Sequence, residues 1–366
     1  MKQRPIWLKI LLSPISFIYW LAVSLRNWLF DIGVLNSQKF ENVTIITIGN
    51  ITMGGTGKTP FTEYLVRTLK DTERVAILSR GYKRKTWGFR LADENSTPHE
   101  IGDEPYQMKK KFPDVTVGVD SKRRRGIENM MDMLNPKPEV FLLDDAFQHR
   151  YVEPDLAVLL VDYNALITKD SIFPMGYLRE PLRAKDRANI VVVTKCPQDV
   201  KPIELHILGK ELNLYPYQSL YFTTMQYEAM KAISDKAENL SIENMKEYSA
   251  LVVSGIAKPE LFEEYVGSHT KNIETIRFAD HHNFSKRDYK NINKKFDEIT
   301  NSRKFIVTTE KDAVRMMNDS NLPDSIKSHI YYIPLTTKFI TDEDKFTSSI
   351  RKHIDANKEY MRISEE

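Results

Sequence analysis

A glycine-rich loop lies between an apolar segment and a helical pattern, and it limits this chain to a small group of folds. The apolar segment covers residues 43–48, and the loop ends in Gly54-Gly55-Thr56-Gly57-Lys58-Thr59-Pro60. This order is typical of a phosphate-binding loop, whose glycines let successive backbone N–H groups converge on phosphate oxygens. Lys58 adds a positive charge for the β and γ phosphates, and the Thr59 hydroxyl completes the ligand shell of a Mg²⁺ ion. The sequence therefore predicts a nucleotide-binding protein.

The loop departs from the general pattern at one position. Thr52 stands where G-x-x-x-x-G-K-[ST] has its first glycine. A plain glycine-rich turn would account for the glycines, but not for the Lys-Thr pair directly after them. We therefore predict that the nucleotide is bound by Thr52, Met53, Gly54, Gly55, Thr56, Gly57, Lys58 and Thr59.

The length and charge of the chain set broad limits on its organisation. At 366 residues it is long enough for two domains, each with its own core. The formal net charge is only +3, so nothing in the totals calls for nucleic acid as a partner. A single cysteine, Cys196, excludes an internal disulfide and fits a reducing compartment, where ATP is present. We interpret Cys196 as a buried residue without a chemical role.

The N-terminal segment is the second strong signal. Residues 10–25 are apolar apart from three serines and one proline, with basic residues on both sides. Sixteen helical residues rise about 24 Å, and spanning a bilayer takes roughly 20 residues, so a shallow anchor is favoured over a full span. Two interpretations stay open: a signal peptide cleaved near Ala22-Val23-Ser24, and an amphipathic helix docked on the protein's own core. A phosphate-binding loop argues against export.

After this segment the chain alternates short apolar stretches with helical patterns, which predicts a parallel sheet covered by helices. Strands are expected at residues 43–48, 75–78, 115–119, 140–143, 156–161 and 190–193, with helices beginning near Pro60, Gly126 and Lys201. A second alternation, through residues 251–253, 273–278, 305–307 and 331–333, predicts a smaller α/β lobe.

The fold class is therefore α/β: a P-loop NTPase-like parallel sheet, a second smaller α/β lobe and an N-terminal membrane-anchoring helix. The predicted limits are an anchor helix at residues 1–30, a P-loop domain at 31–225 and a C-terminal α/β domain at 226–366. The middle boundary is placed where the pattern weakens, between about residues 197 and 247.

Two carboxylates follow the predicted strand at residues 140–143. Asp144 and Asp145 stand where a P-loop enzyme needs a metal ligand, at the end of a neighbouring strand. Adjacent residues on a strand point to opposite sides, so we expect only one of them to bind Mg²⁺ directly and favour Asp144. Gln148 and His149 follow closely and are expected to line the same crevice.

Seven short motifs in the same order together resemble the tetraacyldisaccharide 4′-kinases of lipid A biosynthesis. They are Gly49-Asn50 with the loop ending in Pro60, Ser79-Arg80-Gly81-Tyr82, Gly102-Asp103-Glu104-Pro105, Leu143-Asp144-Asp145-Ala146-Phe147-Gln148-His149, Gly176-Tyr177-Leu178-Arg179-Glu180-Pro181, Asp280-His281-His282 and Thr309-Glu310-Lys311-Asp312-Ala313. Thr52 in place of glycine is also similar to that family's version of the loop. The resemblance runs to about residue 315, and no motif is recognised beyond it.

The resemblance implies an ATP-dependent kinase. Its acceptor would be the 4′-hydroxyl of a tetraacylated glucosamine disaccharide 1-phosphate, and its product the bisphosphorylated precursor of lipid A. Because an acceptor with four acyl chains stays in the bilayer, the enzyme must carry its ATP site to the membrane. We expect a monomer on the cytoplasmic face of the bacterial inner membrane, with Mg²⁺ as the metal.

The resemblance also implies roles for individual residues. Asp103 would act as base toward the sugar hydroxyl, and His281, in the second lobe, would pair with it, with Lys58 as the third catalytic residue. Arg179 and Glu180 would contact the acceptor or its phosphate, together with Gln148 and His149. A surface ion pair remains an alternative for Arg179 and Glu180.

Two other functions stay open at this point. The first is a membrane-recruited P-loop switch ATPase, but that class carries a lysine directly before the two glycines, where this chain has Met53. The second is a non-catalytic membrane adaptor that retains a nucleotide fold. The presence of Lys58, Thr59, Asp103 and Asp144 together argues against such a loss of chemistry.

Overall fold

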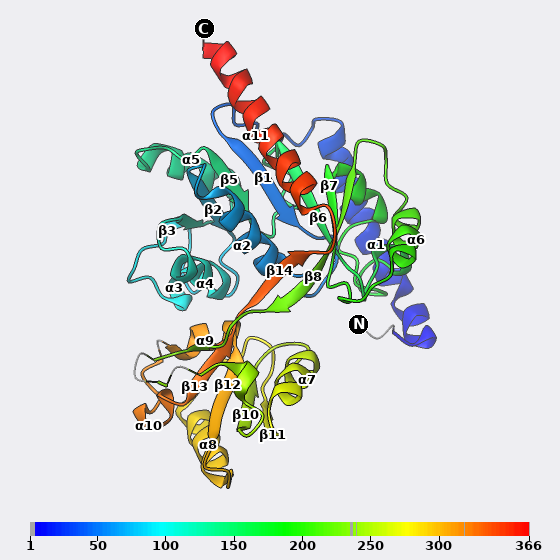
Figure 1. Ribbon diagram of the computed structural model, residues 1–366. Helices are drawn as coiled ribbons and strands as arrows, with labels where there is room; N and C mark the ends of the chain where they lie inside the picture. Colours follow the sequence, from blue (N-terminus) through cyan, green and yellow to red (C-terminus); the bar gives the residue numbers. More distant parts are fainter. Residues whose placement is uncertain (1–3, 235–236, 239, 318, 366) are drawn as a thin grey trace. The chain divides into compact units, whose positions relative to one another are not determined.

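The computed structural model describes residues 4–365, apart from residues 235, 236, 239 and 318. The described residues form two compact units (Figure 1). The first, here called the P-loop unit, contains the chain up to Asn95, Met108–Met225 and the chain from Thr337 onward. The second unit contains Ser96–Gln107 and Gln226–Thr336. Each contains a mostly parallel sheet with helices, with an antiparallel strand at an edge, which confirms the α/β fold class.

The sheet of the P-loop unit has the strand order β14-β8-β7-β6-β1-β5-β2-β4-β3. Its strands are β1 (Thr44–Gly49), β2 (Val75–Ser79), β3 (Arg90–Leu91), β4 (Thr116–Val119), β5 (Val140–Leu143), β6 (Leu156–Asp162), β7 (Ile190–Thr194), β8 (Ser219–Tyr227) and β14 (Leu335–Phe339). The strands expected from the apolar stretches pair in parallel, and every residue of β1 is buried. Burial on both faces explains why these strands read as continuous apolar runs.

Helices cover this sheet, and one of them follows the glycine-rich loop directly. They are α2 (Lys58–Leu69), α5 (Arg123–Met133), α6 (Pro202–Leu212) and the short η1 (Ile167–Lys169) and η2 (Leu182–Arg187). α2 packs on β1 and begins directly after Gly57, with Pro60 in its first turn, where a missing N–H costs nothing. The N-terminal end of α2 therefore lies at the carboxyl end of β1, which is the usual ligand-binding edge of such a sheet.

The C-terminal segment belongs to the P-loop unit, which differs from the predicted limit of 226–366. Helix α11 (Glu343–Glu365) packs on α2 through an aromatic cluster. Its members are Phe61 and Tyr64 of α2, Tyr221 of β8, Phe339 of β14 and Phe346 of α11. Burying this cluster is favourable, and it holds α11 against α2 although the two helices are far apart in the sequence.

The second unit contains a smaller sheet with the order β11-β10-β12-β13-β9. Its elements are α3 (Pro98–Ile101), the first residues of α4 (Asp103–Lys111), β9 (Lys231–Ala232), η3 (Ile242–Asn244), β10 (Ser249–Ser254), α7 (Glu260–His269), β11 (Asn272–Arg277), α8 (Lys286–Glu298), β12 (Lys304–Thr309), α9 (Glu310–Met317), α10 (Asp324–Lys327) and β13 (Ile330–Ile333). A capping box opens α8, where Ser285 Oγ accepts a hydrogen bond from Asp288 N–H.

Residues 96–107 are the second departure from the predicted limits. They were expected in the P-loop domain, because they lie between its second and third predicted strands. The structure places them in the second unit, where Arg315 binds Asp103 and Lys311 binds Glu104 at 3.0 Å. Two ion pairs with distant residues therefore decide the position of a segment whose neighbours on both sides belong to the P-loop unit.

Helix α1 (Ile6–Asp31) extends on both sides of the apolar stretch at residues 10–25. Its polar side docks on the P-loop unit: Tyr19 donates a hydrogen bond to Arg179 O at 3.0 Å, and Asn27 donates to Glu180 Oε1 at 3.1 Å. The opposite side exposes Ile6, Trp7, Ile10, Leu11, Ile15, Phe17, Ile18, Trp20, Leu21, Leu25 and Trp28. Among the described residues, α1 is the one helix long and apolar enough to cross a membrane, a criterion that core helices and signal sequences also meet.

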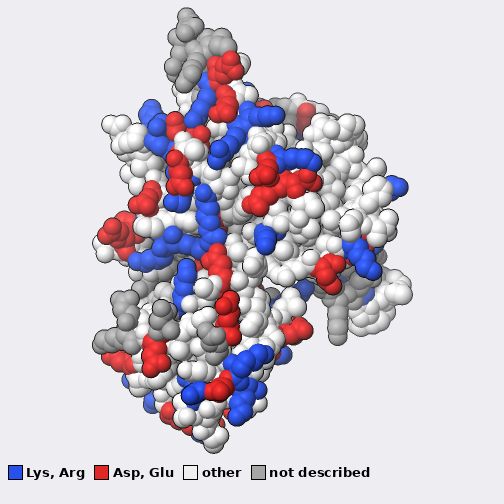
Figure 2. Space-filling model, viewed as in Figure 1, with Lys and Arg blue, Asp and Glu red and all other residues white. Residues whose placement is uncertain are grey.

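Charged side chains are mixed over the face of each unit that Figure 2 shows. Blue and red groups alternate there instead of gathering by sign. This mixture agrees with the formal net charge of +3. The expectation that nucleic acid is not a partner stays a prediction.

Candidate active site

The loop after β1 has the backbone geometry of a phosphate cradle. Gly54 and Gly57 have φ values of +108° and +82°, a region that residues with a Cβ rarely adopt. Asn50 braces the loop from inside, since its side-chain amide donates a hydrogen bond to Thr56 Oγ1 at 3.0 Å. Lys58 then begins α2, so the loop and the N-terminal N–H groups of that helix present positive charge at one place.

The structure explains why threonine stands where the pattern has its first glycine. Thr52 forms an isolated β-bridge with Leu178, and Met53 N–H donates to Tyr177 O at 2.7 Å. The backbone at Thr52 has no positive φ, so a side chain is tolerated there. The same pairing holds residues 177–179 against the start of the loop, which brings Arg179 to the nucleotide side of the sheet.

Two side chains that the sequence analysis missed hold the loop from the end of β7. Thr194 Oγ1 donates to Thr56 O at 2.8 Å, while Lys195 Nζ donates to Gly55 O and lies 2.8 Å from Asp162 Oδ2. In a planar trans peptide, a carbonyl and the next N–H point in opposite directions. Fixing these two carbonyls therefore directs the next N–H groups to the other side of the loop, where phosphate binds. In the sequence, this role was indicated by the position of the two residues directly after the apolar run of residues 190–193.

We expect Lys195→Met to raise the KM for ATP about tenfold and to change kcat by less than about threefold, because the variant loses a charge-assisted bond that orients the loop. Steady-state kinetics over a range of ATP concentrations measures both. Lys169→Met is the matched control, since Lys169 is an exposed lysine of the same unit that pairs with Glu211. An unchanged KM in Lys195→Met would show that the loop keeps its shape without this contact.

The two predicted metal ligands have different surroundings. Asp144 is 1% exposed, and its Oδ1 accepts a hydrogen bond from Thr62 of α2 at 3.1 Å. Asp145 has a φ of +47° and is more open, with Oδ1 3.5 Å from Lys58 Nζ. The positive φ turns the chain between them, so that Asp144 faces α2 and Asp145 faces the lysine of the loop.

Of the four predicted acceptor residues, Arg179 lies near Asp145 and holds Gln148 there. Arg179 Nη1 lies 3.9 Å from Asp145 Oδ2 and donates to Gln148 Oε1 at 3.4 Å. Gln148 in turn donates to Asn50 O at 3.2 Å, which ties it to the loop. Glu180 is buried and accepts from Arg187 at 2.7 Å, so its carboxylate holds local structure together.

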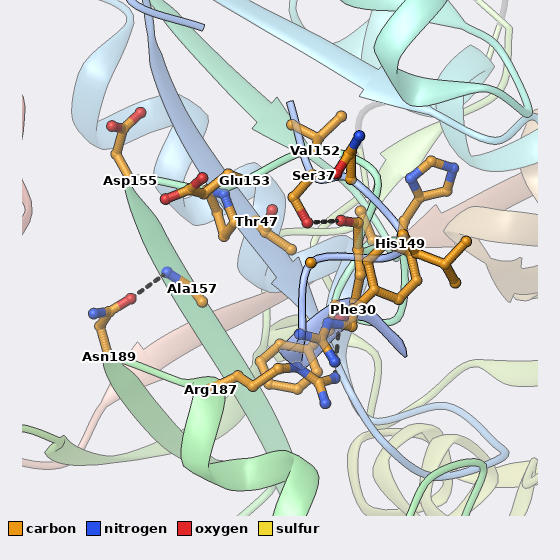
Figure 3. Close-up of a pocket in the computed structure, with 17 residues that line it drawn as sticks. Phe30, Ser37, Thr47, His149, Val152, Glu153, Asp155, Ala157, Arg187 and Asn189 are labelled. Atoms are coloured by element: carbon orange, nitrogen blue, oxygen red, sulfur yellow. Dashed lines mark hydrogen bonds between the residues drawn. The ribbon is translucent and has the colours of Figure 1, made fainter. Parts of the chain in front are cut away.

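His149 lies apart from this group and lines a separate pocket of about 570 Å³ (Figure 3). Phe30 of α1 and Arg187 also line it, and no P-loop residue does. Burial, together with the charge of Arg123, lowers the pKa of His149 to about 4, so the imidazole is neutral near pH 7. Because this pocket lacks the loop, we place the nucleotide at the strand ends and not in this cavity.

The donor set at the loop fits a magnesium nucleotide. Among the described residues, no group of three or more acidic, histidine or cysteine side chains is arranged to hold a metal alone. Mg²⁺ usually takes one or two carboxylates and completes its shell with phosphate oxygens and water. The Thr59 hydroxyl and the carboxylates of Asp144 and Asp145 fit this mode of Mg²⁺ binding. The Lys58 ammonium group lies near Asp145. Cys196 is buried, and burial raises the pKa of its thiol to about 12, so it is no metal thiolate.

Asp103 and His281, predicted as a catalytic pair, lie together in the second unit. His281 Nδ1 is 3.3 Å from Asp103 Oδ2, and Arg315 Nη2 is 2.7 Å from the same oxygen. Burial raises the pKa of Asp103, but the hydrogen bonds from His281 and Arg315 and their positive charge outweigh it and lower the pKa to about 2. The expectation that these residues come from different lobes is wrong, since residues 96–107 belong to the second unit.

The comparison with protein families decides the assignment. A family model described as tetraacyldisaccharide-1-P 4′-kinase matches residues 8–355. This chain belongs to that family. The match extends past residue 315, where the sequence motifs end, and confirms the resemblance.

Relatives of the same family cover nearly the whole chain. Tetraacyldisaccharide 4′-kinase of Parabacteroides distasonis is 46% identical over 349 residues, or 94% of each chain. The protein of that name from Bacteroides thetaiotaomicron is 46% identical over 363 residues, which are 97% of this chain and 95% of the relative. The crystal structure of LpxK from Aquifex aeolicus in complex with ATP has a TM-score of 0.74 at 29% identity, covering 95% of this chain and 99% of that one.

Proposed function

We propose that this chain transfers the γ-phosphoryl group of ATP to the 4′-hydroxyl of a tetraacyldisaccharide 1-phosphate in lipid A biosynthesis. The observation that carries the proposal is the meeting of Lys58, Asp145 and Arg179 beside a phosphate cradle. The ATP complex of the related LpxK supports ATP as the donor, and the names of the relatives support the acceptor. The glycine-rich loop is common to both this reaction and a switch ATPase, but family membership favours the kinase.

The P-loop residues position the donor. When bound, Mg²⁺·ATP would supply the transferable phosphoryl group and neutralise part of its charge. Lys58 would bind the β and γ phosphates, and Thr59 would hold the metal together with Asp145 or Asp144. Arg179, near Asp145, would add a second positive charge that stabilises the charge of the transferred group.

Asp103 receives the proton of the acceptor hydroxyl. A loose phosphoryl-transfer transition state places little charge on the attacking oxygen, so an ionised carboxylate of low basicity is sufficient to accept that proton late. His281, 3.3 Å away, pairs with the same carboxylate. The P-loop belongs to the first unit and Asp103 to the second.

Helix α1 would bring the active site to the membrane lipid. Its docked side contacts the segment that contains Arg179 and Glu180, and its exposed side is apolar over most of its length. An apolar groove of about 490 Å³ runs beside it, lined by Pro14, Phe17, Trp20, Ile172 and Met175 among others. A helix of this kind lies in the membrane interface while acyl chains stay in the bilayer. We place the enzyme on the cytoplasmic face of the inner membrane, acting as a monomer.

We expect the triple variant Trp7→Glu, Leu11→Glu, Ile18→Glu to bind vesicles of anionic phospholipid at least about tenfold more weakly, because three exposed apolar side chains lose their transfer into lipid. Sedimentation with the vesicles measures the bound fraction. Leu261→Glu, at an equally exposed apolar position of the second unit, is the control and should bind normally. Unchanged binding of the triple variant would assign membrane attachment to another surface.

Transfer of label from γ-labelled ATP to detergent-dispersed tetraacyldisaccharide 1-phosphate tests the function itself. Label in the lipid, at the 4′ position of the sugar, supports the kinase. Release of inorganic phosphate at a rate that does not depend on the lipid would favour the switch ATPase instead. Absence of both activities in folded, ATP-binding protein would favour a non-catalytic adaptor.

A further inference from the structure

Arg315 lies against the carboxylate of Asp103. Its Nε and Nη2 atoms are 3.0 and 2.7 Å from Asp103 Oδ2, and the guanidinium is only 6% exposed. Among the described residues, the hydrogen bonds recorded for the Asp103 side chain all go to Oδ2. The other oxygen, Oδ1, takes part in none of these bonds, and the Asp103 side chain is 22% exposed.

Arg315 is itself held in place by a buried carboxylate. Its Nη1 donates to Asp312 Oδ1 at 2.9 Å, and Asp312 is fully buried. Asp312 Oδ2 accepts hydrogen bonds from Gly255 N–H at 2.9 Å and from the Thr309 hydroxyl at 2.7 Å. The ends of β10 and β12 thus fix Asp312, Asp312 fixes Arg315, and Arg315 fixes Asp103. A side chain locked in this way loses little freedom when it binds its partner.

We propose that Arg315 is a positioning residue for phosphoryl transfer, which presents Asp103 as an ionised carboxylate with Oδ1 directed at the acceptor hydroxyl. The inference rests on the proposed function, in which Asp103 accepts the proton of that hydroxyl. Arg315 belongs to the second unit, whereas the nucleotide loop and the proposed metal ligands belong to the P-loop unit. It acts on the reaction through Asp103 alone.

The charges around Asp103 give the sign of the expected pH effect. His281 Nδ1 lies 3.3 Å from Asp103 Oδ2 and 3.1 Å from Arg315 Nη2, and Asp280 lies 4.0 Å from His281 Nε2. Glu104, next to Asp103, is neutralised by Lys311. Removing Arg315 leaves the effect of burial, which raises the pKa of Asp103, opposed by His281 alone. The pKa of Asp103 therefore rises from its wild-type value, and a larger fraction of the carboxyl is protonated and inactive as the pH falls.

Three variants of the full-length protein test the inference: Arg315→Met, Arg315→Lys and the control Arg277→Met. Arg277, whose side chain is 53% exposed, forms a two-bond ion pair with the buried Glu263 in the same unit. We expect Arg315→Met to lower kcat for lipid phosphorylation about 10²-fold and to leave the KM for ATP within about twofold. Arg315→Lys keeps the positive charge but loses the planar guanidinium that makes two bonds to Asp103, so its kcat should fall about tenfold. Arg277→Met should stay within about twofold of the wild-type kcat.

Two further readouts separate positioning from a purely structural role. The ratio of wild-type kcat to Arg315→Met kcat should be at least about threefold larger at pH 5 than at pH 8, because the variant's carboxyl protonates first. Amide hydrogen exchange of residues 99–107 should be faster in Arg315→Met than in the wild type, with other segments unchanged. If Arg315→Met does not fold, the same pH ratio is measured on Arg315→Lys, where a smaller rise in the same direction is expected.

The outcomes distinguish the two proposals. Wild-type protein that fails to phosphorylate the lipid overturns the proposed function. Active wild type with an Arg315→Met kcat within about twofold of normal, or with a ratio that does not change with pH, overturns the role of Arg315 and leaves the proposed function standing.

Discussion

Replacing Lys58 with alanine is expected to lower the rate of phosphoryl transfer to the lipid at least about 10³-fold, because charge stabilisation is the largest contribution to this kind of catalysis. Lys58 is the first residue of α2, and its ammonium group lies 3.5 Å from Asp145 Oδ1. Without that ammonium group, the carboxylates of Asp144 and Asp145 face the triphosphate with less opposing charge. ATP affinity should therefore fall as well as the rate.

Single-turnover transfer and equilibrium ATP binding measure the two effects separately. Lys70→Ala is the matched control, since Lys70 follows α2 and pairs with its neighbour Asp71 at 3.2 Å. It should keep both values within about twofold, as surface ion pairs contribute little. A Lys58→Ala protein that transfers phosphate at near-normal rates would mean that the loop is wrongly assigned.

The second large effect is expected for Asp103→Asn, whose kcat should fall by about 10²–10⁴-fold with ATP affinity largely unchanged. Asparagine keeps the shape and the bonds to Arg315 in part, but it cannot take the proton of the acceptor hydroxyl. ATP affinity is spared because the nucleotide loop and Asp103 belong to different units. Steady-state kinetics with saturating lipid, together with equilibrium ATP binding, checks this split.

Glu298→Gln provides the control for Asp103→Asn, since it neutralises an exposed carboxylate at the end of α8 in the same unit. Its kcat should stay close to that of the wild type. A collapse of ATP affinity in Asp103→Asn, with the control normal, would instead assign Asp103 to the nucleotide site.

Strands and the nucleotide loop were predictable because their signals are local. The apolar runs that became β1, β5 and β7 are buried on both faces, and such burial leaves a continuous apolar pattern in the sequence. The glycines and Lys58 stand next to one another, so a short window contains the whole motif. The pairing of Asp103 with His281 came only from family resemblance, because no local pattern links residues so far apart.

Other features depended on long-range contacts and left no local signal. Arg315 and Asp103 are separated by 212 positions, and their ion pair decides where residues 96–107 lie. Helix α1 extends beyond its apolar stretch because Arg26 and Asn27 find partners on Gln148 and Glu180. Lys195 was missed for the same reason, because the carbonyl that it binds, Gly55 O, lies in the loop after a different strand, β1.

The interleaving of the two units also bears on how this gene can change. The chain passes between the units at residues 95–96, 107–108, 225–226 and 336–337. A fragment ending at residue 225 would lose Phe346 and expose the aromatic side chains of α2, and a fragment starting at 226 would lack Asp103. Recombination between homologous genes that exchanges only one end of the coding sequence would thus separate residues selected to work together. A hybrid that inherits each unit whole needs four breakpoints, one at each of these crossings, so that residues 96–107 and 226–336 are exchanged together.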